Sequence, residues 1–302
     1  WSPIPWAGPI AGVRVGRVNG NFVANPTYQE LEESDCDLVI AASKDAIVMV
    51  EGEAKELSEA DLLEALFFGH GAVQGAISTI EKVRAQIQTP KWVFVSPSRD
   101  ASLDSRVRET ALPAVQEACN ISEKHARYSR FKEAKKQTKA ALSSEFPELD
   151  KQVAEAFEDL RYEVMRGQIL KERRRVDGRD LVTVRPIDIE IGWLPRTHGS
   201  ALFTRGETQA IVTATLGTAQ DEQKIDALTG EYWKRFLLHY NFPAFSVGEV
   251  KPLRGPGRRE VGHGNLAERA LSGLIPSVEE FPYTIRVVSE ITESNGSSSM
   301  AS

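Results

Sequence analysis

The sequence predicts an α+β protein in which two β-rich segments flank an all-helical one. Alternating, β-branched runs gather toward both ends of the 302-residue chain. Residues 104–173 are instead rich in Ala, Glu, Lys and Leu, with only Pro113 and Pro147 as helix breakers. Hydrophobic residues make up 41% of the chain, enough to build cores, and a chain of this length suits about two or three domains.

The first segment, residues 1–88, has the pattern of a small sheet covered by helix. Asn19-Gly20 predicts a tight hairpin turn. Further strands are expected at 37–42 and 46–51. Ser58 is a good helix N-cap, and the helical spacing of apolar residues after it predicts one or two helices that end near Gln88.

The middle segment, residues 89–172, begins with a proline-containing linker over 89–100 and continues as three or four helices. Residues 124–139 are rich in Lys and Arg, with Tyr128 and Phe131 interleaved. This stretch has two interpretations, an RNA-backbone contact or a solvated helix face, and general experience favours the second.

The last segment, residues 173–302, returns to strand patterns. A strand is expected over 182–191, a hairpin from 200–204 to 208–216, a helix over 266–274 and a buried strand over 283–291. The chain therefore runs from β-rich to helical and back to β-rich.

Composition excludes several classes of function. The net charge of -6 argues against an overall basic nucleic-acid coat, so any polyanion must be held by a local patch. No apolar stretch is long enough to span a membrane, and we expect no membrane partner. Cys36 and Cys119 lie far apart without CxxC spacing, which predicts two buried thiols in a reducing compartment. Because the chain opens on Trp1 without a Met, we expect it to be a piece of a longer protein.

Two segments predict a phosphate site. The loop Ser294–Ser299, here called the serine loop, offers backbone N–H groups and hydroxyls, with no carboxylate after Glu293 to repel an anion. Upstream, the segment 257–264 supplies Arg258, Arg259 and His263 between glycines. Adjacent guanidinium groups suit planar, bidentate contacts with phosphate. If the fold brings both segments together, they form a pocket for one or two phosphates.

Plainer interpretations exist for each feature. An arginine pair by itself is usually a surface ion-pair donor, a serine-rich loop is usually a solvated turn, and Ser297 is also a possible helix cap. For the three residues that flank the predicted hairpin, a structural role and a weak RNA-backbone contact are equally open: Arg196, His198 and Arg205. Asp221, Glu222 and Asp226 lack convincing ligand spacing, so no metal ligand is assigned.

Several segments resemble the polynucleotide phosphorylase family. In the last segment they are Arg175-Val-Asp-Gly-Arg179 with Val184-Arg-Pro186, the run 194–209, His239-Tyr-Asn-Phe-Pro243 with Ser246-Val-Gly-Glu249, Arg258-Arg-Glu-Val-Gly-His-Gly264, and 281–302. In the first they are Gly8-Pro-Ile with Arg14-Val-Gly, Asn25-Pro-Thr27 and Phe68-Gly-His70. The match covers nearly all of 173–302 and is highly specific.

The resemblance implies two partial ribonuclease-PH-like cores, each of ribosomal-protein-like β-α-β-α type, separated by an all-helical domain. Residues 1–88 are then the later half of the first core, 89–172 the helical domain, and 173–302 the earlier half of the second, catalytic core. It also implies a homotrimeric ring around a channel for single-stranded RNA. Because each core is incomplete here, with exposed sheet edges and apolar surface, we expect the chain alone to be inactive.

The resemblance also implies an activity, that of a nucleotidyltransferase and phosphate-dependent 3′→5′ exoribonuclease. Such an enzyme releases nucleoside diphosphates, runs backwards to extend RNA, and acts in mRNA degradation and RNA processing. In this family the matched positions line the phosphate and catalytic site: Arg258, Arg259, His263, Gly296, Ser297, Ser298 and Ser299. Inorganic phosphate is the co-substrate, and Mg²⁺ or Mn²⁺ is held by aspartates expected beyond Ser302.

The family's setting is a bacterial-type cytoplasm, with an organelle as an open alternative, and its partners include proteins of RNA-degradation complexes. The competing interpretation is a non-catalytic ring subunit that only threads RNA, as in exosome-like assemblies. Such subunits tend to lose the arginine pair or the serine loop, and this chain keeps both.

Overall fold

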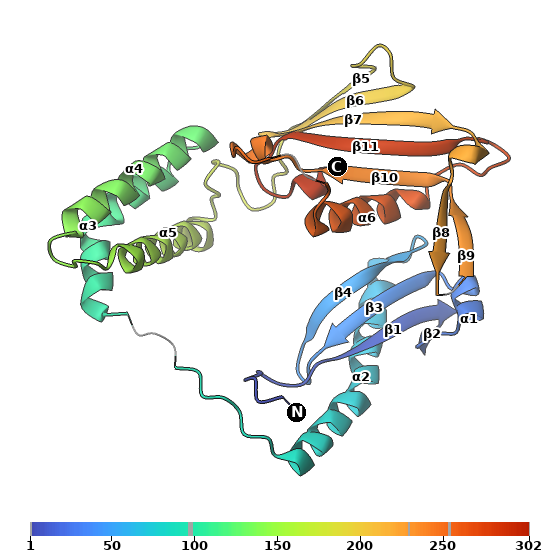
Figure 1. Ribbon diagram of the computed structural model, residues 1–302, viewed down its shortest axis with the longest axis horizontal. Helices are drawn as coiled ribbons and strands as arrows, with labels where there is room; N and C mark the ends of the chain where they lie inside the picture. The colour runs from blue at the N-terminus through green and yellow to red at the C-terminus, as the bar shows by residue number, and fades with distance from the viewer. Residues whose placement is uncertain (1, 96–98, 229, 253–254, 302) are drawn as a thin grey trace. The chain divides into compact units, whose positions relative to one another are not determined.

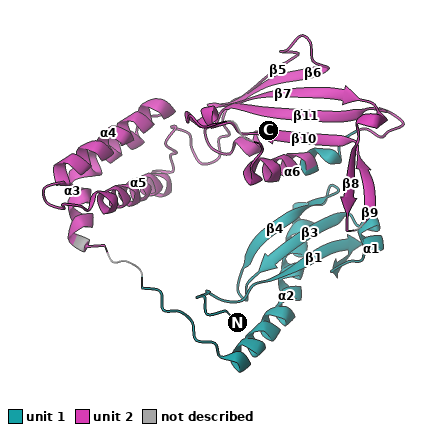
Figure 2. Ribbon diagram, viewed as in Figure 1, with its two compact units in different colours: residues 1–96, 269–275 teal, residues 97–268, 276–302 magenta. Residues whose placement is uncertain are grey.

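The computed structural model describes residues 2–95, 99–228, 230–252 and 255–301. The chain divides into two compact units, Trp1–Ser96 with Arg269–Ile275 and Pro97–Glu268 with Pro276–Ser302 (Figure 2). Residues 96–98 of the predicted linker, and the chain ends Trp1 and Ser302, lie outside the described residues. Helices and strands mix as the α+β prediction requires, so this prediction is confirmed (Figure 1).

The first unit is a four-stranded antiparallel sheet with one long helix on it. Its elements are β1 (Ala11–Val18), β2 (Asn21–Ala24), α1 (Tyr28–Glu33), β3 (Cys36–Ala42), β4 (Ile47–Ala54) and α2 (Glu59–Ile87). The strands lie in the order β2-β1-β3-β4. The hairpin predicted at Asn19-Gly20 is confirmed, because both residues have positive φ, 49° and 78°, and β1 pairs with β2 across them.

Helix α2 buries one stripe against this sheet. Ser58 caps the helix by accepting from the Asp61 N–H, as the sequence predicted. The buried residues of α2 recur every four positions: Ala65, Gly69, Val73 and Ile77. They meet a sheet face whose core includes Val15 and Ile40, both fully buried. The alternation read in the sequence therefore places one face of the sheet under the helix.

Gly52 on β4 sits where a side chain has no room. A Cβ at this position would lie 2.1 Å from the Asp37 carbonyl oxygen and 2.8 Å from the Leu38 Cα. We expect Gly52→Ala to lower the free energy of unfolding of this unit by about 2 kcal/mol, because a clash with backbone cannot be relieved by a rotamer change. Urea denaturation followed by circular dichroism measures the loss.

Gly12 on β1 is the matched control for Gly52. A Cβ there would meet only the Ile40 carbonyl oxygen, at an ordinary 3.8 Å. Gly12→Ala is expected to change the free energy of unfolding by less than about 0.5 kcal/mol. Equal losses at the two positions would contradict the steric argument.

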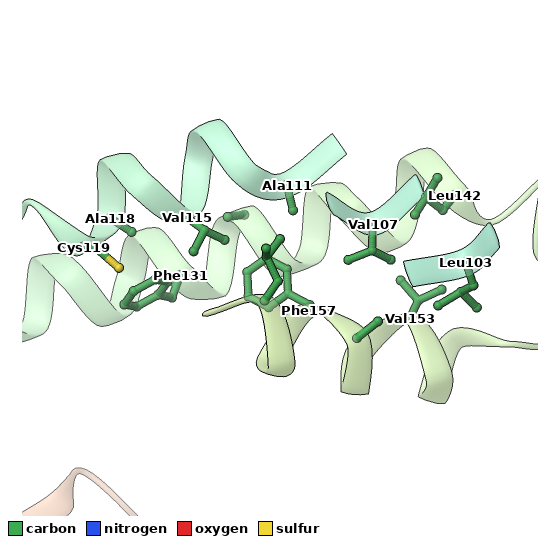
Figure 3. Close-up of a cluster of buried hydrophobic side chains, with 13 residues drawn as sticks. Leu103, Val107, Ala111, Val115, Ala118, Cys119, Phe131, Leu142, Val153 and Phe157 are labelled. Atoms are coloured by element: carbon green, nitrogen blue, oxygen red, sulfur yellow. The ribbon is translucent and has the colours of Figure 1, made fainter. Parts of the chain in front are cut away.

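The helical part of the second unit contains three helices among its described residues: α3 (Ala101–Cys119), α4 (Lys124–Leu142) and α5 (Asp150–Glu172). Their shared core is drawn in Figure 3, with Val115 from α3, Phe131 from α4 and Phe157 from α5. Two basic side chains of 124–139 form ion pairs within this bundle. Arg130 pairs with Glu117 at 2.6 Å and Lys135 with Glu158 at 2.9 Å. These contacts favour the interpretation of the stretch as a helix face.

The sheet of the second unit has five strands in the order β10-β11-β7-β6-β5, with β10 and β11 parallel and the other neighbours antiparallel. Its elements are β5 (Ile187–Ile191), β6 (Gly199–Arg205), β7 (Thr208–Gly217), β10 (Phe236–Asn241) and β11 (Thr284–Glu293). A separate hairpin joins β8 (Gln223–Ala227) to β9 (Gly230–Lys234), and short 3₁₀ turns cover Ala219–Asp221, Ala244–Val247 and Ser298–Met300.

Two predicted elements of this unit had wrong bounds. The strand expected over 182–191 begins only at Ile187, because the Asp180 carboxylate accepts the N–H groups of Val182 and Thr183 that a ladder would need. The helix expected over 266–274 is α6, which runs over Arg258–Ser272 and so begins eight residues earlier. Arg258 and Arg259 therefore lie in the first turn of a helix and not in a loop.

Both cysteines are buried, as predicted, and burial raises the pKa of each thiol. Cys36 belongs to the core of the first unit, and Cys119 to that of the helical part. Among the described helices, none combines the length and the apolar character that crossing a bilayer requires.

Candidate functional site

The first turn of α6 is fastened to the end of β10 by one carboxylate. Glu260 accepts the Phe242 N–H at its Oε1, at 2.9 Å, and the Gly257 N–H at its Oε2, at 2.7 Å. An acidic side chain in the first turn also complements the positive end of the helix. Arg258 and Arg259 immediately precede this carboxylate in the sequence and are exposed. Glu260 thus fixes the backbone that carries both guanidinium groups.

Arg259 lies against an aromatic pair. Its guanidinium carbon is 4.4 Å from the centroid of the Phe242 ring, a cation–π contact. Phe242 in turn stacks on Tyr240 of β10, with ring centroids 6.1 Å apart and planes inclined by 14°. This stack connects the arginine to the interior of the unit.

Tyr240 is the point at which the predicted site residues meet. Its ring is buried, its hydroxyl pairs with the Ser298 Oγ at 2.8 Å, and His263 of α6 approaches it edge-on at 5.3 Å between centroids. Burial raises the pKa of the Tyr240 hydroxyl, which stays a neutral hydrogen-bonding group near pH 7. Arg259, His263 and the serine loop are thereby joined through Tyr240 and Phe242.

His263 has one nitrogen that the protein leaves unused. Its Nδ1 is buried and finds no hydrogen-bond partner among the described residues. Buried polar atoms without a partner are uncommon in folded proteins and point to a ligand, a water or a catalytic role. The imidazole also lies on α6 one residue before Gly264, whose backbone packs on β10. The geometry keeps open the predicted use of His263 as a donor or proton carrier.

The serine loop turns sharply and then forms a 3₁₀ turn. Gly296 and Ser297 both have positive φ, 74° and 54°, and a right-handed 3₁₀ turn follows Ser297; this change of hand makes successive backbone N–H groups converge. Ser297 is exposed, Ser299 is half-buried, and Ser298 is only 2% exposed. The hydroxyl of Ser298 is engaged by Tyr240, so Ser297 and Ser299 have the more accessible hydroxyl groups. The individual roles of the three serines stay predictions.

The three residues that flank the β6–β7 hairpin behave differently from one another. Arg205 donates to the carbonyl oxygens of Gly296, at 3.3 Å, and Ser297, at 2.9 Å, so it supports the serine loop. His198 accepts the Leu216 N–H at its Nδ1, at 2.8 Å, which ties the two strands of the hairpin together. Arg196 is exposed between β5 and β6. Their weak assignment as RNA-binding residues stays a prediction.

Two hollows adjoin these residues. One, of about 810 Å³, is lined by residues that include Phe242, Lys251, Arg259, Glu260 and Glu290; its described lining contains no residue of the serine loop. The other, of about 430 Å³, lies beside the serine loop and is here called the arginine groove. It is lined by Gly296 and Ser297, four arginines, and a short apolar stretch: Arg175, Arg179, Arg185, Arg205 and Val182–Val184.

Sequence reasoning missed Arg185, Tyr240 and Phe242 as parts of the site. All three stood inside the motifs that carried the family resemblance, but no role was attached to them. A usable signal was the aromatic repeat Tyr240-Asn-Phe242, which places both rings on one face of an extended chain. For a metal, the described residues contain no group of three or more His, Cys, Asp or Glu side chains arranged to hold an ion.

Three family models match this chain. The 3′ exoribonuclease family, domain 1, matches residues 183–302, and domain 2 of the same family matches residues 8–72. The model described as polyribonucleotide nucleotidyltransferase, RNA binding domain, matches residues 102–180. A polyribonucleotide nucleotidyltransferase of Sorangium cellulosum is 55% identical over 99% of this chain, and one of Pelobacter propionicus is 56% identical over 99%.

The chain belongs to the polyribonucleotide nucleotidyltransferase family. The resemblance seen in the motifs is thereby confirmed, as is the class of two ribonuclease-PH-type parts around a helical one. The chain spans 40% and 42% of the length of these two family members, and 43% of a relative from Geobacter sulfurreducens. The residue boundaries of the three segments stay predictions.

A solved structure titled as an Archaeoglobus fulgidus exosome with RNA bound to the active site is also similar. It is 16% identical over 48% of this chain and 57% of its own chain, with a TM-score of 0.35. This likeness is too low to carry an inference about the present chain.

Proposed function

We propose that the protein is a phosphate-dependent 3′→5′ exoribonuclease that releases nucleoside diphosphates from RNA and can run in reverse. The observation that carries the proposal is the connection, through Tyr240 and Phe242, of Arg259 and His263 to the serine loop. The names of its relatives, which are nucleotidyltransferases, support the same chemistry.

Phosphorolysis requires few catalytic side chains. An oxygen of inorganic phosphate attacks the last phosphorus of the RNA, and the bond from that phosphorus to the 3′ oxygen of the preceding nucleotide breaks. The products are a nucleoside diphosphate and an RNA one nucleotide shorter, whose 3′ oxygen takes up a proton. Because the nucleophile is already anionic, the site must mainly bring two repelling phosphates together and neutralise the developing charge.

The residues of this chain fit those demands. Arg258 and Arg259 supply two fixed positive charges at the start of α6, where the helix adds its own positive end. The backbone of Gly296 to Ser299, with the hydroxyls of Ser297 and Ser299, suits inorganic phosphate. His263, with an unused Nδ1, suits hydrogen bonding to a phosphate oxygen or delivery of the proton.

Mg²⁺ or Mn²⁺ belongs to the proposal as the ion that would neutralise phosphate charge when bound. The described residues do not fit such an ion, because they lack a suitable cluster of ligands, and no step above passes through it. Single-stranded RNA as substrate, a homotrimeric ring, association with RNA-degradation proteins, a role in mRNA decay and a bacterial-type cytoplasm are likewise parts of the proposal.

The test is a degradation assay on 5′-labelled oligo-RNA, using the protein expressed from its complete reading frame. We expect stepwise shortening and nucleoside diphosphate release only when inorganic phosphate is present, and extension of the RNA when nucleoside diphosphates replace phosphate. Shortening that is indifferent to phosphate, or that yields monophosphates, would refute phosphorolysis. RNA binding without either reaction would instead favour the non-catalytic ring subunit.

A further inference from the structure

Four successive carbonyl groups of the serine loop are bound by cationic side chains. Lys124 Nζ donates to the Ser294 oxygen at 2.6 Å. Arg185 donates to the oxygens of Asn295, at 2.5 Å, and Gly296, at 3.4 Å. Arg205 donates to the oxygens of Gly296, at 3.3 Å, and Ser297, at 2.9 Å. The three cations come from α4, from the segment before β5 and from the end of β6, so distant parts of the unit converge on one side of the loop.

This arrangement dictates where the loop's N–H groups point. In a trans peptide, C=O and N–H point in opposite directions, and no cis peptide bond occurs in the described chain. With the oxygens of Asn295, Gly296 and Ser297 turned toward Arg185 and Arg205, the N–H groups of the following residues must face the other way. Those are the donors that an anion-binding turn presents to its ligand.

The surroundings of Arg185 disfavour its positive charge, so its hydrogen bonds to the serine loop matter for its placement. Arg185 is partly buried, and desolvation is the first cause that lowers the pKa of its guanidinium, followed by repulsion from Arg179 and Arg205. Placing like charges together in a partly dry setting is unfavourable unless hydrogen bonds offset it. Asp177 offsets it in part, at 3.8 Å from the Arg185 Nε. The carbonyl oxygens of the serine loop supply the remaining contacts.

We propose that Arg185 and Arg205 are positioning residues that hold the serine loop in its phosphate-binding conformation. The proposal rests on the proposed function, since it assigns inorganic phosphate to this loop. It differs from the RNA-backbone role considered for Arg205, because the Nη2 group of that side chain already donates to two protein carbonyls. Charge in the groove would then matter less than the hydrogen bonds to the loop.

Arg175 offers a matched control for charge. It lines the same arginine groove, but its side chain donates to the Leu181 carbonyl oxygen, at 2.9 Å, within its own segment. Arg175→Gln therefore removes one positive charge from the groove and leaves intact the hydrogen bonds from Arg185 and Arg205 to the serine loop, here called the clamp. Arg205→Lys keeps the charge but reaches one carbonyl in place of two.

The experiment measures the KM for inorganic phosphate, kcat, and RNA affinity without phosphate, in the protein expressed from its complete reading frame. We expect Arg205→Gln and Arg185→Gln to raise the KM for phosphate at least tenfold. Arg205→Lys should fall between these variants and the wild type, and Arg175→Gln should change the KM less than about twofold. RNA affinity should stay within about twofold in all four variants, because the clamp holds the serine loop, which binds inorganic phosphate and not RNA in this proposal.

Two outcomes overturn the proposal: an unchanged KM for phosphate in the Arg205 and Arg185 variants, or an equal rise in Arg175→Gln, which would show a charge effect only. A parallel titration of inorganic phosphate by calorimetry keeps the two proposals separate. If the wild type binds phosphate but does not degrade RNA, the proposed function is wrong. The clamp is still tested in that case, because it predicts that Arg205→Gln loses phosphate binding. Circular dichroism spectra matching the wild type exclude misfolding as the cause.

Discussion

Replacing Arg259 with alanine is expected to lower kcat/KM for phosphorolysis about 100-fold, the usual cost of removing one fixed donor to a developing negative charge. The same change at Arg258 should have an effect of similar size, because both guanidiniums stand in the first turn of α6. Stability should change much less. The contact that Arg259 makes with Phe242 is an exposed cation–π pair, worth about 0.5–1 kcal/mol.

Lysine variants sharpen this prediction. Arg259→Lys keeps the positive charge but loses the planar, bidentate fork, so its rate should lie between those of the wild type and Arg259→Ala. Arg286, an exposed arginine on β11 of the same unit, is the control: Arg286→Ala should keep kcat/KM within about twofold. Steady-state kinetics with varied phosphate and urea denaturation are measured on each variant. Wild-type turnover in Arg259→Ala with an intact fold would remove the arginine pair from the site.

Much of the fold could be predicted from signals that lie within a few residues of one another in the sequence. The positive-φ turn at Asn19-Gly20 and the cap at Ser58 depend only on neighbouring residues, and both are present. The start of α6 depends on distant ones. Gly262 and Gly264 argue against helix locally, yet a Cβ at Gly264 would lie only 3.3 Å from the Leu238 carbonyl oxygen, so the glycine lets the helix pack on β10. That contact cannot be read from the residues around it.

The residues of the candidate site likewise fall into those with a local sequence signal and those without one. The family motifs singled out the arginine pair with His263, and the serines, because each of these two groups lies within one short run of the sequence. Tyr240 was missed, although its hydroxyl contacts Ser298, because the two residues are 58 positions apart. Arg185 was missed for the same reason, since its partner Asn295 is 110 positions away. Side chains that connect or support a site through long-range contacts have no periodic or local signature.

Glu260→Ala is expected to lower kcat about 100-fold although Glu260 itself carries no predicted catalytic role. The variant leaves the N–H groups of Phe242 and Gly257 without their carboxylate partner and frees the first turn of α6 to fray. Displacing a reacting group by about 1 Å can cost about 100-fold in rate. Arg258 and Arg259 immediately precede the lost anchor, so both are displaced together. The accompanying loss of unfolding free energy should be about 1–3 kcal/mol.

Glu268 separates positioning from stability. It lies on the same helix, and its Oε2 accepts the Leu238 N–H of β10 at 3.0 Å, the same kind of contact two turns further from the arginines. Glu268→Ala should therefore cost comparable unfolding free energy, measured by urea denaturation, while kcat falls less than about threefold. Glu260→Gln, which keeps one acceptor oxygen, should restore part of the rate. If both alanine variants lost activity in proportion to their loss of unfolding free energy, the role of Glu260 would be structural only. The turn that carries the arginines would then respond no differently from the rest of α6.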